Sequence, residues 1–159
     1  MKVDPLPQAK IGEIIGLLEI LEDIEGKEDI HKIARQLNFD LENLAPIIDA
    51  LELLELARIS DGDIALTELG IKFLNSDVND RKLIFKKQLK TLEVFKEAIL
   101  ILKGSDDNQI DRECFVETFS THITDEDAEY LVNTVILWGR YAELIGYNSD
   151  SEEIYLDQI

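Results

Sequence analysis

The chain has 159 residues, of which 45% are hydrophobic, enough for a buried core in one ordinary domain or two small ones. Its formal net charge of −18 and pI near 4.3 disfavour binding to phosphate backbones and to anionic membranes. The single cysteine, Cys114, excludes an intramolecular disulfide and a cysteine-based zinc site. The N-terminus lacks the apolar region of a secretory signal, and no apolar run reaches the roughly 20 residues that span a bilayer. We therefore expect a soluble, cytoplasmic protein without membrane insertion.

Two helices are predicted in the first part of the chain. Apolar residues recur at helical spacing over residues 9–25 and again over residues 27–37. Gly26 is expected to end the first of these helices as a C-cap residue. Gly12 and Gly16 lie four residues apart in that helix, a spacing that predicts the close approach of a neighbouring helix.

The stretch from residue 40 to 67 predicts a third helix followed by a hairpin. Asp40 is expected to cap the helix through its side chain, and Pro46 predicts a kink or a start nearer Ala45. Asp61-Gly62 lies between two short apolar runs, which is typical of a hairpin with a type I′ turn. A helix followed by a two-stranded ribbon is the core of a winged helix-turn-helix.

The second half repeats this order of elements without repeating the sequence. A polar segment over residues 75–80 predicts a domain boundary, which gives a first unit of residues 1–76 and a second of 77–159. The second unit is expected to begin with a long helix over residues 78–102. If this helix bends, we expect the bend near Lys90 and Thr91. Asp111 and Thr124 are expected to cap two further helices, and strands are expected over 143–147 and 153–156. The predicted fold class is mainly α with small β-hairpins (α+β), built as two tandem winged helix-turn-helix-like units.

Winged helices usually bind nucleic acid, but the charges on the two predicted third helices oppose it. A groove-reading helix presents Arg, Lys, Asn or Gln to base edges, with flanking Lys and Arg near phosphates. Residues 41–56 and 124–138 each carry four Asp or Glu and contain no Lys or Arg. We therefore do not expect nucleic acid to bind through these helices.

Positive charge gathers instead on the predicted long helix. Lys82, Lys86 and Lys90 share one side of that helix and form a stripe. The stripe is either a solvated face that balances acidic neighbours or a docking site for an acidic partner, including a second copy of this chain in a homodimer.

The sequence predicts no catalytic, cofactor-binding or metal site, so we do not expect an enzyme. His31 and His122 lack partners at ligand spacing, and Cys114 is expected to be a small buried residue. The acidic segment 106–111 lacks the central Gly and terminal Glu of an EF-hand loop, and the chain has no P-loop.

Five segments of the chain resemble the AAA-associated C-terminal domain family, which follows the ATPase module in nitrate/sulfonate/bicarbonate-type ABC transporter ATP-binding proteins. They are PLPQAKIGEIIGLLEILED, GKEDIHKIARQL, IALTELGIKFL, DRKLIFKKQL and WGRYAELIGY, which lie in family order between Pro5 and Leu156. The most specific pieces are residues 8–12 and 138–143, the latter with Trp138, Arg140 and Tyr141. The resemblance implies a regulatory or assembly domain without catalytic residues. This sequence begins without the ATPase module, so a free-standing copy is expected to act in trans or to have another role.

Three hypotheses follow. The first is a non-enzymatic regulatory or protein-interaction module whose partner is an ABC transporter ATP-binding subunit, with Lys82, Lys86, Lys90, Trp138, Arg140 and Tyr141 as candidate interaction residues. The alternative is a winged-helix DNA-binding transcriptional regulator. The third is a sensor that binds a small ligand between the two units. Retention on DNA, co-purification with an ATPase subunit and a ligand-dependent melting shift distinguish the three.

Overall fold

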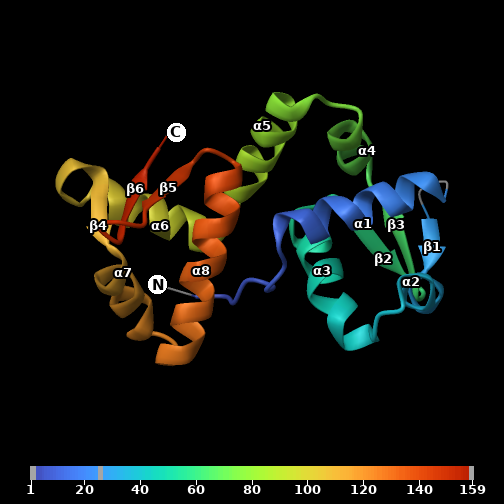
Figure 1. Cartoon of the computed structure of the whole chain (residues 1–159), viewed down its shortest axis with the longest axis horizontal. Coiled ribbons are helices and arrows are strands. Elements are labelled where there is room, and N and C mark those ends of the chain that lie inside the picture. The colour runs from blue at the N-terminus through green and yellow to red at the C-terminus, as the bar shows by residue number, and fades with distance from the viewer. Residues whose placement is uncertain (1–2, 25–26, 158–159) are drawn as a thin grey trace. The chain divides into compact units, whose positions relative to one another are not determined.

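A computed structural model describes residues 3–24 and 27–157 (Figure 1). The chain is mainly helical with two small antiparallel sheets, which confirms the predicted fold class. It folds as two compact units, one from Pro7 to Ile84 and the other from Phe85 onward, together with the described residues before Pro7. The units therefore divide inside a helix, α5 (Val78–Leu89), whereas the sequence analysis places the boundary at 76/77. Gly26, the predicted C-cap, lies outside the described residues.

The first unit contains three helices and a three-stranded sheet, followed by a short helix that leads towards α5. The sheet has the strand order β1-β3-β2, and α1 packs against α3, β3 and α4 (Figure 1). The elements are α1 (Ile11–Asp23), β1 (Lys27–Asp29), α2 (Ile30–Leu37), α3 (Leu41–Leu53), β2 (Ala57–Ser60), β3 (Asp63–Leu66) and α4 (Glu68–Leu74).

The hairpin of the first unit has the predicted turn. Asp61 and Gly62 both have positive φ, at 52° and 82°, as both central residues of a type I′ turn require. The twist of this turn matches that of the flanking strands, so β2 and β3 pair in register from Ala57 opposite Leu66 to Ser60 opposite Asp63. Ile64 is fully buried and fixes which face of the hairpin covers the core.

Helix α4 packs closely on the base of this hairpin because Gly70 has no side chain. A Cβ atom at Gly70 would lie 2.1 Å from the carbonyl oxygen of Leu56. Thr67 fixes the start of α4: its hydroxyl accepts a hydrogen bond from the Gly70 amide at 3.0 Å and donates one to the Glu55 carbonyl at 2.7 Å.

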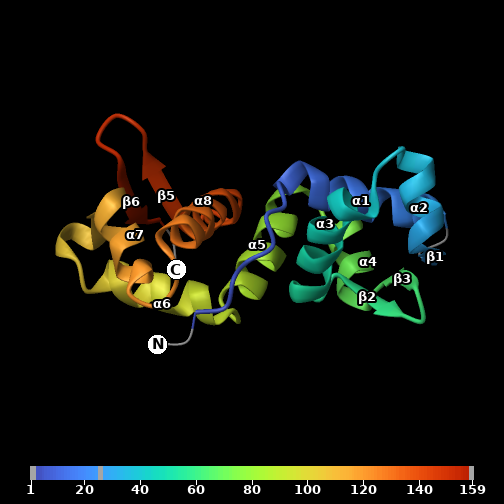
Figure 2. The ribbon, with the colours of Figure 1, turned by 90° about the horizontal axis from the view of Figure 1, so that it is seen from below.

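The second unit repeats the order of helices and strands. Its sheet has the order β4-β6-β5, and α8 packs against both α7 and β5 (Figure 2). The elements after α5 are α6 (Glu93–Lys103), the 3₁₀ turn η1 (Asp106–Asn108), β4 (Gln109–Asp111), α7 (Arg112–Ser120), α8 (Asp125–Tyr141), β5 (Ile145–Asn148) and β6 (Glu153–Leu156).

The two units share the geometry with which the third helix ends. Glu55 after α3 and Glu143 after α8 both adopt left-handed φ, at 61° and 56°. The next amide in each case reaches back to a helix carbonyl: Leu56 to Leu51 and Leu144 to Gly139, both at 2.9 Å. This satisfies carbonyls that a helix end would otherwise leave unpaired. The topological repeat predicted from the order of elements therefore extends to equivalent hydrogen bonds.

One strand in each unit was not predicted. Strand β1 pairs with β3, with Glu28 opposite Ile64, and β4 pairs with β6, with Ile110 opposite Ile154. Each is only three residues long and leads directly into a helix, so neither shows enough alternation to predict a strand.

The predicted long helix over 78–102 is wrong as a single element. It consists of α5 and α6, and the bend considered near Lys90 and Thr91 is the actual break. The Thr91 hydroxyl donates to the Gln88 carbonyl at 2.6 Å and so satisfies a carbonyl at the end of α5. Leu92 then takes extended backbone angles and begins the next helix.

Three local predictions for the first unit need correction. Helix α3 begins at Leu41 and continues through Pro46, so a start near Ala45 is wrong. Asp40 is the N-cap residue but its side chain makes no capping hydrogen bond. A Cβ placed at Gly12 or Gly16 would meet nothing within 4 Å, so no helix approaches closely there.

Candidate interaction surface

The third helix of each unit exposes carboxylates, as the sequence predicts. In α3 the side chains of Glu42, Asp49 and Glu52 are exposed, and in α8 those of Glu126 and Glu129 are exposed. The apolar sides of both helices face their own unit's core, with Leu51 and Val135 fully buried. Helix α8 extends to Tyr141, so it carries one cation, Arg140, in its last turn, where it suits the negative end of the helix dipole.

Helix α8 also exposes two large apolar side chains on the same face. Tyr130 is 45% exposed and Leu137 is 48% exposed, and Asn133 lies between them at helical spacing. Exposed aromatic and aliphatic side chains on one face of a helix are typical of protein-binding surfaces. The sequence analysis missed this pair, although both residues lie out of phase with the buried set of α8.

A groove of about 350 Å³ lies between α7 and α8 and is lined by carboxylates. Glu113 and Glu117 come from α7, and Asp125 and Glu129 come from α8. A cleft with acid on both walls favours basic groups and repels phosphate. We refer to this groove together with the exposed face of α8 at Tyr130, Asn133 and Leu137 as the α8 surface.

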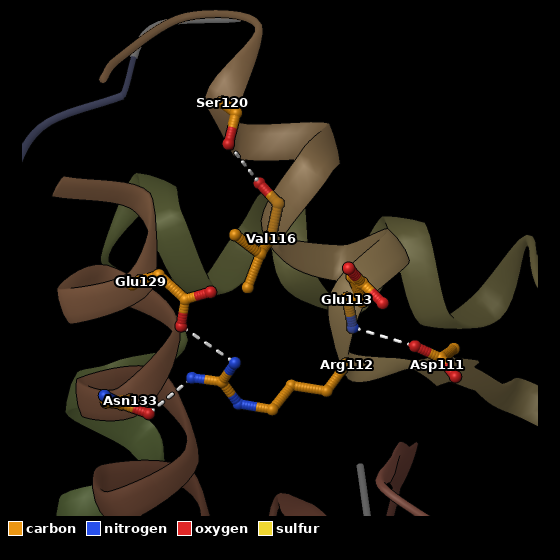
Figure 3. Close-up of polar contacts among 7 residues, drawn as sticks. All are labelled: Asp111, Arg112, Glu113, Val116, Ser120, Glu129 and Asn133. Atoms are coloured by element: carbon orange, nitrogen blue, oxygen red, sulfur yellow. Dashed lines mark hydrogen bonds and ion pairs between the residues drawn. The ribbon is translucent and has the colours of Figure 1, made fainter. Parts of the chain in front are cut away.

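Arg112 joins the two walls of this groove (Figure 3). Its Nη1 lies 2.9 Å from Oε2 of Glu129, and its Nη2 donates to Oδ1 of Asn133 at 2.6 Å. The Asp111 side chain caps α7 by accepting from the Glu113 amide at 2.8 Å. Arg112 therefore tethers the start of α7 to the middle of α8 and fixes the orientation of Glu129.

The structure places the predicted interaction residues in different surroundings. Lys82 and Lys86 are half-buried residues of α5, whereas Lys90 lies beyond its end, so the lysine stripe does not continue along one helix. Lys82 belongs to the first compact unit and the other two lysines to the second. Docking of a partner on these lysines stays a prediction.

The Trp138 motif belongs largely to the core of the second unit. Trp138 is fully buried, with its ring centroid 6.2 Å from that of Phe85 at an interplanar angle of 82°. Tyr141 is half-buried and makes a similar edge contact with Phe85 at 5.1 Å and 83°. Such edge-to-face pairs stabilise cores by roughly 1 kcal/mol beyond their buried area. Among the three motif residues Arg140 alone is exposed.

The side chains considered for catalysis or metal binding belong to different elements. His31 and His122 are both exposed, the first on α2 and the second in the turn before α8. Cys114 is exposed, so the predicted burial is wrong. It lies on the outer side of α7, whereas Phe115 and Val116 lie on the side that faces the core. Within residues 3–24 and 27–157, no three His, Cys, Asp or Glu side chains cluster to hold a metal ion.

These features define an acidic, mainly helical protein built from two similar helix-and-hairpin units. A family model described as the C-terminal AAA-associated domain matches residues 31–148. The chain belongs to this family, which supports a link to AAA or ABC-type ATPases. The match includes the segment with Trp138, Arg140 and Tyr141, whereas the resembling segment over residues 8–12 lies outside it. Comparison with curated proteins and with solved structures found no match. In the part of the chain that the structure describes, no helix is both long and apolar enough to cross a membrane.

Proposed function

We propose that the protein is a non-enzymatic regulatory and protein-interaction module of winged-helix type that binds an ABC-type ATP-binding subunit in the cytoplasm. Membership in the AAA-associated family supports the ATPase as the class of partner. The observation that supports a protein rather than nucleic acid is the α8 surface, where exposed Tyr130 and Leu137 share a helix with the exposed carboxylates of Glu126 and Glu129.

The charges on this surface favour a basic protein patch as its counterpart. A carboxylate 4 Å from a phosphate is repelled by about 1 kcal/mol even in water, and several would line a nucleic-acid groove at once. Cationic contacts normally supply nonspecific affinity for DNA. The exposed face of α8, the helix that would enter a DNA groove, instead carries Glu126 and Glu129. Aromatic and apolar side chains at the centre of a surface usually supply most of the affinity for a protein partner.

Binding to a purified ATP-binding subunit from the same source cell tests the proposal. We expect the wild-type chain to bind the subunit, and the double variant Tyr130→Ala, Leu137→Ala to bind at least tenfold more weakly. Leu100→Ala is the matched control, because Leu100 is a 63% exposed residue of α6 in the same unit. The control should bind within about twofold of wild type.

Two outcomes would overturn the proposal. A wild-type chain that does not bind the subunit would reject the ATPase as partner. Equal binding by the double variant and wild type would reject the α8 surface as the site. Salt-dependent retention on duplex DNA would instead support the alternative, a winged-helix transcriptional regulator.

A further inference from the structure

The first unit contains an apolar groove that the proposed function does not use. It lies where α1, the end of α2 and the start of α3 meet, and it has a volume of about 180 Å³. A hollow of about 150 Å³ lined by aliphatic and aromatic residues can hold a molecule the size of benzene. The groove therefore has room for one large aliphatic or aromatic side chain. Its lining includes Leu17, Ile20, Leu37, Phe39, Leu44 and Ile47.

The absence of a side chain at Gly16 keeps the groove open. Gly16 lines the groove, and a Cβ placed there would meet no atom within 4 Å. Phe39, in the turn between α2 and α3, is 43% exposed and lines the groove, and Leu41 beside it is 42% exposed. Deeper in the groove, Leu17 and Leu44 are buried and belong to the core of the unit. The surface thus combines a buried apolar floor with an exposed aromatic rim.

The helices on both sides of this groove are acidic. Helices α1 and α3 contain seven carboxylates and no Lys or Arg: Glu13, Glu19, Glu22, Asp23, Glu42, Asp49 and Glu52. Glu13 lines the groove, and its carboxylate is held in place by a hydrogen bond from the Lys10 amide at 2.9 Å. The cations of α2 are Lys32 and Arg35, and Lys32 lies 3.5 Å from Glu28. The groove is therefore lined by apolar residues and by Glu13, and the two helices beside it carry an excess of negative charge.

We propose that this groove is a docking site for a cationic amphipathic helix of a partner protein, in which one large apolar side chain fills the groove while Lys or Arg residues face α1 and α3. Helix-in-groove recognition uses apolar anchors at helical spacing, and charge complementarity fixes orientation and increases the association rate. The negative charge of α1 and α3 disfavours anionic membranes and nucleic acid as occupants. A second copy of this chain is a poor occupant because each copy carries a net charge of −18. The proposal concerns a different unit from the α8 surface and does not depend on the ATPase.

A synthetic peptide tests this site directly. The probe is a fluorescein-labelled helix of about 14 residues in which leucines recur at i, i+3, i+4 and i+7 and lysines occupy the other positions. We expect saturable binding to the full chain that weakens as salt is added. In ¹⁵N-labelled protein the amide shifts should change at Gly16, Ile20, Leu37 and Phe39 before those of the second unit.

Paired glycine variants then separate groove filling from a general change in α1. Gly16→Leu places a side chain in the groove and should weaken peptide binding at least tenfold. Gly12→Leu is the control: it makes the same replacement one turn earlier, at a position that is equally unobstructed but does not line the groove. It should bind within about twofold of wild type. Phe39→Ala offers a second variant on the rim and should weaken binding at least threefold.

Several results would overturn the proposal. These are no binding at millimolar peptide, equal affinity of Gly16→Leu and Gly12→Leu, or shift changes confined to the second unit. Tighter binding of a peptide with glutamates in place of lysines would also contradict it. So would a stable dimer of the chain that is dissociated by Gly16→Leu, because a second copy would then be the occupant.

Discussion

At Gly70 a single methyl group decides whether α4 can lie against the hairpin. The replacement Gly70→Ala would bring Cβ to 2.1 Å from the backbone oxygen of Leu56, and neither backbone can move without disturbing the Thr67 cap. We expect this variant to lower the free energy of unfolding by about 2–3 kcal/mol, the upper part of the range for overpacked cores.

Gly12→Ala is the matched control for this prediction, because it sits in a helix with open space around it. It should raise the free energy of unfolding by roughly 0.5–1 kcal/mol, as alanine favours helix over glycine. Urea unfolding of both variants measures the difference. If Gly70→Ala is as stable as wild type, the packing of α4 does not depend on the close approach of Gly70 to the Leu56 carbonyl oxygen.

Which residues are exposed on a helix is predicted less well than the helix itself. Cys114 sits on an amphipathic helix, and its position one residue from Phe115 places it on the outer side, a phase that composition alone does not reveal. Tyr130 and Leu137 show the reverse, because both are large apolar residues that lie exposed on α8. Gly16 was predicted to admit a helix and instead opens a groove.

Among the helices and strands, several features that depend on residues close in sequence, such as turns and helix caps, are predicted correctly. The Asp61-Gly62 turn and its hairpin follow from turn chemistry, and the Thr124 cap follows from its side chain, which accepts from the Asp127 amide at 3.1 Å. Strands β1 and β4 depend on pairing with residues 34 to 46 positions away along the chain. No local pattern encodes that pairing, so sequence reasoning missed both. Arg112 and its partners on α8 were missed for the same reason.

The contact of Arg112 with α8 should contribute measurably to the second unit. Arg112→Gln removes the ion pair with Glu129 and weakens the hydrogen bond to Asn133. It should lower the free energy of unfolding by about 1 kcal/mol, because the contact is partly exposed. For a chain of this size that lowers Tm by roughly 2–4 °C. The loss should shrink as salt is added.

Arg35→Gln is the control for this prediction, since it removes the same charge from an exposed helix end. We expect it to change stability by no more than about 0.5 kcal/mol. The double variant Arg112→Gln, Glu129→Gln should lose less free energy of unfolding than the two single variants lose in sum. Additive losses would mean that the two side chains do not interact in solution.

For the molecule as a whole, the dominant physical property is its net charge of −18. Self-repulsion of that size destabilises the compact state, and salt screens it. Between about 0.01 M and 1 M salt the Debye length falls from about 30 Å to about 3 Å. We expect Tm to rise by several degrees over this range. The rise should be the same in NaCl and in KCl, because screening depends on ionic strength. A Tm that falls with salt would show that favourable ion pairs outweigh the repulsion.

Exposed carboxylates occupy the helix surfaces that a groove-reading protein makes basic, and we propose that this family member therefore binds protein and not nucleic acid. Parallel titrations of the full chain against a labelled DNA duplex and against the ATP-binding subunit test it most directly. Near 0.01 M salt, where cationic contacts would be strongest, we predict no retention of the duplex, and near 0.15 M salt we predict saturable binding of the subunit. Saturable binding of the duplex that weakens steeply with salt, without binding of the subunit, would contradict the account.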